Sequence, residues 1–148
     1  MSFNYQLLKT IALSLLGGLI IFLLYLLVIV FIGIPNTNSD FLNTVFIGPI
    51  KEEILKFLVV LFFIKRFTSY KLTATSVGFG FGLGEQLLHL YHGDPILWYV
   101  ILMHSIAGFV SGVFLQKNSK FRAIFGATTV HVIYNLGLWI YILFIISY

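Results

Sequence analysis

The sequence predicts an all-α membrane protein, a single polytopic bundle of about five transmembrane helices. Hydrophobic residues make up 59% of the 148 residues and charged residues only 9%, whereas soluble domains carry about 25% charged residues. Five apolar stretches are long enough to cross a bilayer core of about 30 Å, which takes roughly 20 helical residues. The loops between these stretches are short, so we expect one transmembrane domain over residues 1–148 and no soluble domain.

The predicted spans follow one another closely along the chain. The first is too long for a signal peptide and has no small-residue cleavage site, so we expect it to be retained. The second begins near Phe41, where Ser39 or Asp40 is a plausible N-cap. The five spans cover about residues 11–34, 41–64, 72–90, 96–115 and 123–146.

Glycines recur through the third span. Residues 77–84 alternate with period two, which on a soluble chain suggests a strand, but a lone strand cannot satisfy its backbone in lipid. In a helix, Gly78 with Gly82 and Gly80 with Gly84 form small-xxx-small pairs, which let neighbouring backbones approach closely. We therefore expect a helix that lies at the centre of the bundle.

Basic residues in the loops predict the orientation. Every basic loop falls on the same side of a five-span chain, so by the positive-inside rule the N-terminus should be cytoplasmic. The loops on the other side contain Asp40 and Asp94 but neither Lys nor Arg. The basic residues in question are Lys9, Lys65, Arg66, Lys71, Lys117, Lys120 and Arg122.

The composition also excludes several functions. The chain has no cysteine, so it can form neither a disulfide, nor a thiolate nucleophile, nor a cysteine-ligated metal site. Its net charge of +4 comes from nine basic residues spread along the chain, which make no patch for nucleic acid. We expect contact with the lipid bilayer and none with nucleic acid.

Ionisable side chains interrupt the later spans. Each costs at least ~2.5–3.5 kcal/mol in the bilayer and therefore suggests a function. Glu52 and Glu53 lie one turn before Lys56, so one carboxylate can pair with the ammonium while the other faces a pocket. The helical rise places all these groups between the midplane and the outer half, where they could meet. The others are Glu85, His104, His131 and Asn135.

A pocket of this kind can activate water. A carboxylate beside a cation and away from bulk water can take a proton, and histidines can relay protons or polarise a carbonyl. The Asn135 amide can donate to a developing oxyanion. Pro49 removes a backbone hydrogen bond just before the carboxylates and could open the helix to water. Hydrolysis of a peptide bond within the membrane would use all of these parts.

Four short motifs follow in order, one on each span from the second to the fifth. Residues 52–56 match E-E-x-x-K, 81–85 match F-x-x-x-E, 104–108 match H-x-x-x-G and 131–135 match H-x-x-x-N. Together they resemble the PrsW family of intramembrane proteases, which is related to the CAAX prenyl endopeptidases and the bacterial abortive-infection proteases. The protease core implied by the resemblance covers about residues 45–137.

The resemblance implies an intramembrane endopeptidase of the bacterial plasma membrane that cleaves a membrane-anchored protein near the outer surface, as PrsW-type enzymes cleave anti-sigma factors. It implies that Glu52 and Glu53 supply the catalytic base and that Asn135 holds the oxyanion. Glu85, His104 and His131 would complete the catalytic centre. Lys56 would support it by pairing with a carboxylate, and Gly108, which shares a helix face with His104, by close packing.

The sequence leaves a metal open. Glu52 or Glu53 could bind zinc together with His104 and His131, because two histidines and a glutamate with one open position form a known catalytic set. The chain has no H-E-x-x-H motif, and the family has been described both as metallo- and as glutamic-type. We favour glutamate chemistry without a cofactor.

Three other classes compete with the protease. A small ion- or proton-coupled transporter would also bury Glu and His in mid-membrane, but it should show repeated halves or matched broken helices. A haem protein could use His104 and His131 as axial ligands, which would leave the glutamates unexplained. A non-catalytic membrane scaffold is the third alternative.

Overall fold

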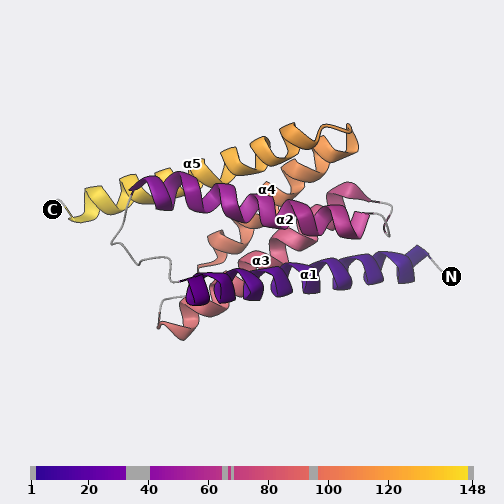
Figure 1. The fold of residues 1–148 in the computed structure, drawn as a ribbon, viewed down its shortest axis with the longest axis horizontal. Helices are drawn as coiled ribbons and strands as arrows, with labels where there is room; N and C mark the ends of the chain where they lie inside the picture. The colour runs from indigo at the N-terminus through magenta and orange to yellow at the C-terminus, as the bar shows by residue number, and fades with distance from the viewer. Residues whose placement is uncertain (1–2, 33–40, 65–66, 68, 94–96, 147–148) are drawn as a thin grey trace.

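The chain is all-helical, as predicted (Figure 1). The computed structural model describes residues 3–32, 41–64, 67, 69–93 and 97–146. These residues form five α-helices and one π-helical segment, and no strand. In chain order the elements are α1 (Phe3–Ile32), η1 (Asn43–Ile47), α2 (Gly48–Ile64), α3 (Tyr70–Tyr91), α4 (Trp98–Gln116) and α5 (Lys120–Ile146).

Each predicted span corresponds to one helix, with differences at the ends. α1 begins at Phe3 rather than near residue 11, so Lys9 belongs to the helix instead of preceding it. η1 continues directly into α2, and residues 41–64 form one unbroken helix as predicted. The predicted N-cap at Ser39 or Asp40 lies outside the described residues.

Within the described parts of the chain, three helices are long and apolar enough to cross a membrane by themselves, and the chain is a helical membrane protein. They are Tyr5–Leu27 within α1, the whole of α4 and Lys120–Ile145 within α5. Taken alone, α2 has only 17 residues, and α3 contains Lys71 and Glu85. The polar side chains of these two helices face their neighbours, because Glu53 and Lys56 of α2 and Gln86 of α3 are buried.

α3 lies at the centre of the bundle, which confirms the prediction from its glycines. It contacts α1, α2 and α4. The two glycine pairs face different neighbours: a Cβ on Gly78 would strike the backbone carbonyl of His104 in α4, and a Cβ on Gly80 would strike that of Leu15 in α1. Close backbone approach on both sides therefore fixes α3 between α1 and α4.

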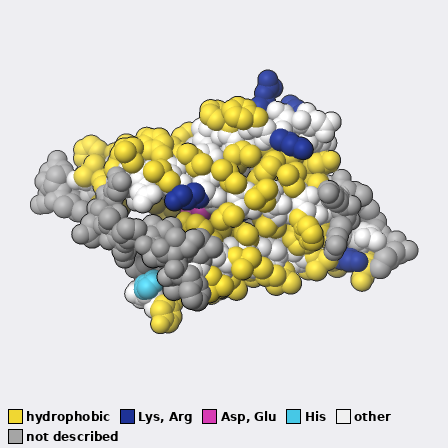
Figure 2. All heavy atoms as spheres, in the orientation of Figure 1, with side chains coloured by type: hydrophobic (Ala, Val, Ile, Leu, Met, Phe, Trp, Pro, Cys, Tyr) yellow, Lys and Arg dark blue, Asp and Glu magenta, His cyan; other side chains and the backbone are white. Residues whose placement is uncertain are grey.

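The helices alternate in direction. Figure 1 shows the N-terminus at the same end of the bundle as the α2–α3 and α4–α5 connections, and the C-terminus at the other end. Lys9, Lys71 and Lys117, which are exposed, belong to this end, and Figure 2 shows mainly apolar side chains over the rest of the visible surface. The basic loops thus share one end, as predicted, except that Lys65, Arg66, Asp40 and Asp94 lie outside the described residues.

Buried apolar side chains occur along the whole interior, whereas the ionisable ones lie in one half of it. A buried apolar cluster fills the half near the basic end, where α2, α3, α4 and α5 meet. Its members are Phe57, Val60, Ala74, Val77, Leu115 and Ala123. The ionisable side chains of the spans lie beyond this cluster, toward the other end. α5 lies at one edge of the bundle (Figure 1), and of its described residues only Ala123, Ala127 and His131 are fully buried.

Candidate active site

α2 directs two charged side chains into the bundle. Lys56 Nζ donates a hydrogen bond of 2.5 Å to Glu53 Oε1, one turn earlier on the same helix. Both side chains are buried, with 5% and 3% of their surface exposed. Lys51, in the neighbouring turn, is exposed. The rotation of α2 about its axis therefore directs Lys56 into the interior and Lys51 out of it.

The ammonium of Lys56 also reaches α4 and, through it, α3. Lys56 Nζ lies 2.6 Å from His104 Nδ1, and His104 Nε2 lies 2.5 Å from Glu85 Oε2. An ammonium can only donate, so Nδ1 accepts. The ring proton is then on Nε2, which donates to Glu85. The fully buried His104 ring therefore links Lys56 to Glu85 as a neutral imidazole.

α5 contributes His131 to the same cluster. Its Nδ1 lies 3.1 Å from Glu53 Oε1 and 3.9 Å from Glu52 Oε2. A proton on Nδ1 is donated to Glu53, and the lone pair is then on Nε2, as in other carboxylate–histidine pairs. The rings of His131 and His104 meet edge to face with their centroids 4.8 Å apart. A flat macrocycle does not fit between rings in contact, so this arrangement gives the haem alternative no support.

Glu52 is the carboxylate that Lys56 does not bind. Its Oε2 is buried and has no hydrogen-bond partner among the described residues. The hydroxyl of Tyr25, on α1, forms a hydrogen bond with the same carboxyl group. One carboxylate thus pairs with the lysine, as the spacing of residues 52–56 predicts, and the other keeps an oxygen without a hydrogen bond. An open buried oxygen can accept a proton from a bound molecule.

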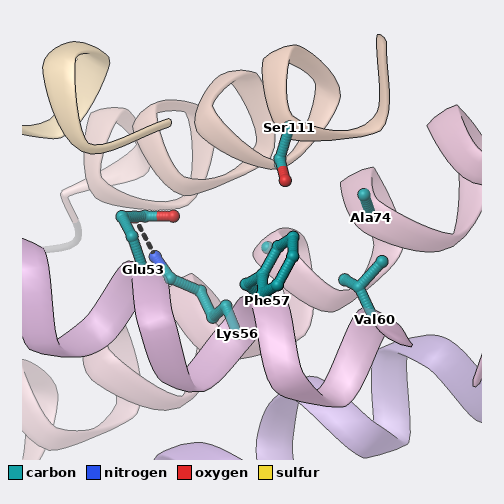
Figure 3. A pocket seen from close by; sticks show the side chains of 8 residues that line it. Glu53, Lys56, Phe57, Val60, Ala74 and Ser111 are labelled. Atoms are coloured by element: carbon teal, nitrogen blue, oxygen red, sulfur yellow. Dashed lines mark hydrogen bonds and ion pairs between the residues drawn. The ribbon is translucent and has the colours of Figure 1, made fainter. Parts of the chain in front are cut away.

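A small cavity lies beside the Glu53–Lys56 pair. Its volume is about 10 Å³, close to the minimum for one water molecule. Figure 3 shows the joined Glu53 and Lys56 on α2 and the Ser111 hydroxyl of α4 directed into the same space. Gly108 lines this cavity, and a Cβ there would strike the backbone carbonyl of Ala74 in α3. Gly108 therefore lets α4 approach α3 next to His104.

Asn135 lies one turn beyond His131 on α5 but contacts a different part of the molecule. Its Nδ2 donates a hydrogen bond of 2.9 Å to the backbone carbonyl of Thr44, in η1. The structure thus does not join Asn135 to the Glu/His cluster. Its role as oxyanion donor stays a prediction, and the contact it makes here is with backbone.

The other predicted site residues meet in one place. The structure brings together Glu52, Glu53 and Lys56 of α2, Glu85 of α3, His104 of α4 and His131 of α5. We call these six residues the Glu/His cluster. Sequence reasoning missed Tyr25, whose only signal is that it carries the sole hydroxyl of the first apolar stretch after Ser14.

Three residues of the cluster offer donor atoms at the spacing of a zinc site. One ligand atom from each of Glu52, His104 and His131 lies within 4.8 Å of the others, and zinc accepts such ligands. However, Lys56 occupies Nδ1 of His104 and Glu85 occupies Nε2. The Lys56 ammonium also already supplies a positive charge among the carboxylates. The residues in this arrangement do not fit zinc unless His104 gives up one of its two partners.

Comparison with known proteins assigns no family. No family model, no curated protein and no solved structure matches this chain. A functional interpretation therefore depends on the residues themselves and on how the helices arrange them.

Proposed function

We propose that the chain is a PrsW-like intramembrane endopeptidase that hydrolyses a peptide bond of a membrane-anchored protein. The observation that carries this proposal is the open Oε2 of Glu52, which is buried 3.9 Å from His131 Nδ1 where four helices converge. A cluster that only held helices together would be expected to close all its polar atoms on one another, because open buried polar atoms destabilise the fold. This one keeps a carboxylate oxygen free to react.

Glu52 acts as the base in this mechanism. It takes a proton from a water molecule while the water oxygen attacks the carbonyl carbon of the scissile bond. The tetrahedral intermediate then collapses, the C–N bond breaks, and Glu52 returns the proton to the leaving amine. The products are a new carboxyl terminus that contains the water oxygen and a new amino terminus.

The remaining cluster residues hold this base in place. Glu53 orients His131 through Nδ1, and Lys56 balances the charge of Glu53 in an interior where an unpaired charge is costly. His104 connects Lys56 to Glu85 and so fixes α2 against α3 and α4. Tyr25 orients the Glu52 carboxylate from α1.

An apolar groove between α1 and α2 provides a route for a membrane-anchored substrate. Its volume is about 370 Å³, and its lining residues are Gly17, Ile20, Ile21, Leu24, Leu58, Val59, Phe62 and Phe63. Leu24 directly precedes Tyr25, so a segment lying in this groove continues toward Glu52. Such a substrate would be a single-span protein of the bacterial plasma membrane, for example an anti-sigma factor.

The transporter alternative has less support. Transporters with midplane ion sites typically use broken helices in matched positions of two halves. Among the described residues, the π-helical segment η1 has no counterpart in another helix.

Hydrolysis can be tested directly in vesicles. The purified chain would be reconstituted with a library of single-span peptides, each with about 20 apolar residues and a varied outer flank, in water enriched in ¹⁸O. We expect mass spectrometry to find fragments whose new carboxyl terminus carries one ¹⁸O atom. Their rate of formation should fall by about 10²–10⁴-fold in Glu52→Gln, the usual contribution of a general base.

Lys51→Gln is the matched control, because it changes an exposed residue beside Glu52. It should insert and cleave like the wild type. Addition of a chelator should leave the rate unchanged. Fragments that form equally fast in Glu52→Gln, or no fragments with the wild type, would contradict the proposed function.

A further inference from the structure

We propose that Asn135 is a positioning residue that supplies the hydrogen bond Pro49 cannot make. It thereby holds the Glu52 end of α2 in register with α5. The observation behind this inference is the 2.9 Å hydrogen bond from Asn135 Nδ2 to the carbonyl of Thr44. This carbonyl lies five residues before Pro49, in the π-helical segment Asn43–Ile47.

The local register explains why this particular carbonyl needs a side-chain donor. In a π-helix each N–H donates to the carbonyl five residues earlier, and Gly48 N–H indeed donates to Asn43 O. The next bond in that register would run from residue 49 to Thr44 O, but proline has no N–H. The donor in α register would be Gly48 N–H, which is already used. Asn135 therefore replaces a backbone donor that both registers lack.

The same contact bears on the Glu/His cluster. His131 and Asn135, one turn apart on α5, bind the continuous helix 41–64 at two separate levels, Glu53 Oε1 and Thr44 O. Two such contacts define both the rotation of this helix about its axis and its height against α5. That rotation decides where Glu52 points. The catalytic consequence rests on the proposed function, whereas the bond to Thr44 does not.

Pro49→Ala provides the test, because alanine restores an N–H that can serve Thr44 O directly or free Gly48 N–H to do so. In the wild-type background, Asn135→Leu should lower the Tm by about 2–4 °C, the shift expected for loss of one hydrogen bond. It should also lower kcat by about 10²-fold on the peptides that the wild type cleaves in ¹⁸O-enriched water. A loss of this size is the cost of displacing reacting groups by about 1 Å. In the Pro49→Ala background, Asn135→Leu should lower the Tm by less than half as much as in the wild-type background. It should lower kcat only a few-fold.

Thr129→Val is the matched control, since it removes a 2.8 Å side-chain bond to the Phe125 carbonyl on the exposed face of the same helix. It should change kcat less than twofold in either background. Should Pro49→Ala fail to accumulate, Pro49→Ser supplies the same N–H.

Each outcome of this cycle decides the proposal. Equal Tm losses in the two backgrounds would overturn the link between Asn135 and Pro49. Coupled Tm losses with an undiminished 10²-fold loss of kcat would mean that Asn135 contacts the oxyanion itself, which overturns the positioning role. If the wild type cleaves no peptide, the proposed function fails while the Tm cycle still confirms or refutes the bond.

Discussion

The two helix pairs that flank the Glu/His cluster pack in opposite ways. α3 and α4 meet backbone to backbone, with Gly78 against the carbonyl of His104 and Gly108 against that of Ala74. α1 and α2 instead leave an apolar groove of about 370 Å³ between them. The polar groups divide along the same line. The hydrogen-bonded residues Glu85, His104, Lys56, Glu53 and His131 lie beside the closely packed helices α3 and α4. Glu52, with its open oxygen, faces α1.

Under the proposed function, this difference would separate the positioning of the reactive group from the access of the substrate. A reactive group has to be held within a fraction of an ångström by residues that are themselves fixed, and backbone contact through glycine gives such support to His104. A large substrate, in contrast, needs a side of the molecule where helices can separate at low cost. The α1–α2 side offers such an opening, because its groove is lined by apolar residues, although the Phe63 ring packs on the α1 backbone at Gly17.

Loss of Lys56 should have the largest effect on this arrangement. Lys56→Met removes the ammonium that joins Glu53 to His104 and leaves a buried carboxylate without its partner. We expect the free energy of unfolding to fall by about 3–5 kcal/mol, measured by titration with a denaturing detergent. Lys51→Met, on the exposed face of the same helix, should change it by less than about 0.5 kcal/mol. Similar effects of the two substitutions would show that α2 is rotated relative to the structure described.

Added volume at the tight pair should have an intermediate effect. Gly78→Ala places a Cβ against the backbone of His104, where no flexible side chain can yield. We expect a loss of about 1–3 kcal/mol from overpacking, measured in the same titration. Gly137→Ala is the control: a Cβ there meets nothing within 4 Å, so this change should stabilise α5 by about 0.5–1 kcal/mol. If Gly78→Ala is neutral, α3 and α4 do not meet backbone to backbone.

Filling the groove should affect stability least and access most. Leu58 lines the groove and is 55% exposed, so Leu58→Trp should change the unfolding free energy by less than about 0.5 kcal/mol. Peptide cleavage should nevertheless slow about tenfold, equivalent to about 1.4 kcal/mol in the activation barrier. Leu102→Trp, at a comparably exposed position of α4 outside the groove, should leave cleavage unchanged. Equal cleavage rates in these two variants would place substrate entry elsewhere.

Much of the candidate site could be predicted because few variables determine it. The helical rise predicts similar depths for Glu52, Glu85, His104 and His131 from the span boundaries alone, and the structure brings the four side chains into one cluster. The spacing of Glu53 and Lys56 on one helix made their pairing possible. Glycine spacing identified the central helix, because only close backbone packing explains small residues every four positions in an apolar run.

The remaining features depend on rotations that the sequence does not encode locally. Glu52 and Glu53 are both within reach of Lys56, and only the phase of α2, set in η1, decides between them. The partner of Asn135 depends on a change of helical register for which Pro49 is the only visible sign. Tyr25 was not assigned, although Thr10, Ser14, Gly17 and Gly18 recur at helical spacing and mark the face of α1 that is buried in the bundle.

The peripheral position of α5 exposes this helix to the lipid. Its 27 residues span about 40 Å at 1.5 Å per residue, more than the hydrocarbon thickness of about 30 Å, and a helix of excess length accommodates by tilting. His131 is carried on this helix, about 16 Å from its first residue, whereas the carboxylates it contacts belong to the protein interior. A change in membrane thickness would therefore act on the contact between this imidazole and its acid partners, and the proposed hydrolysis should depend on bilayer thickness.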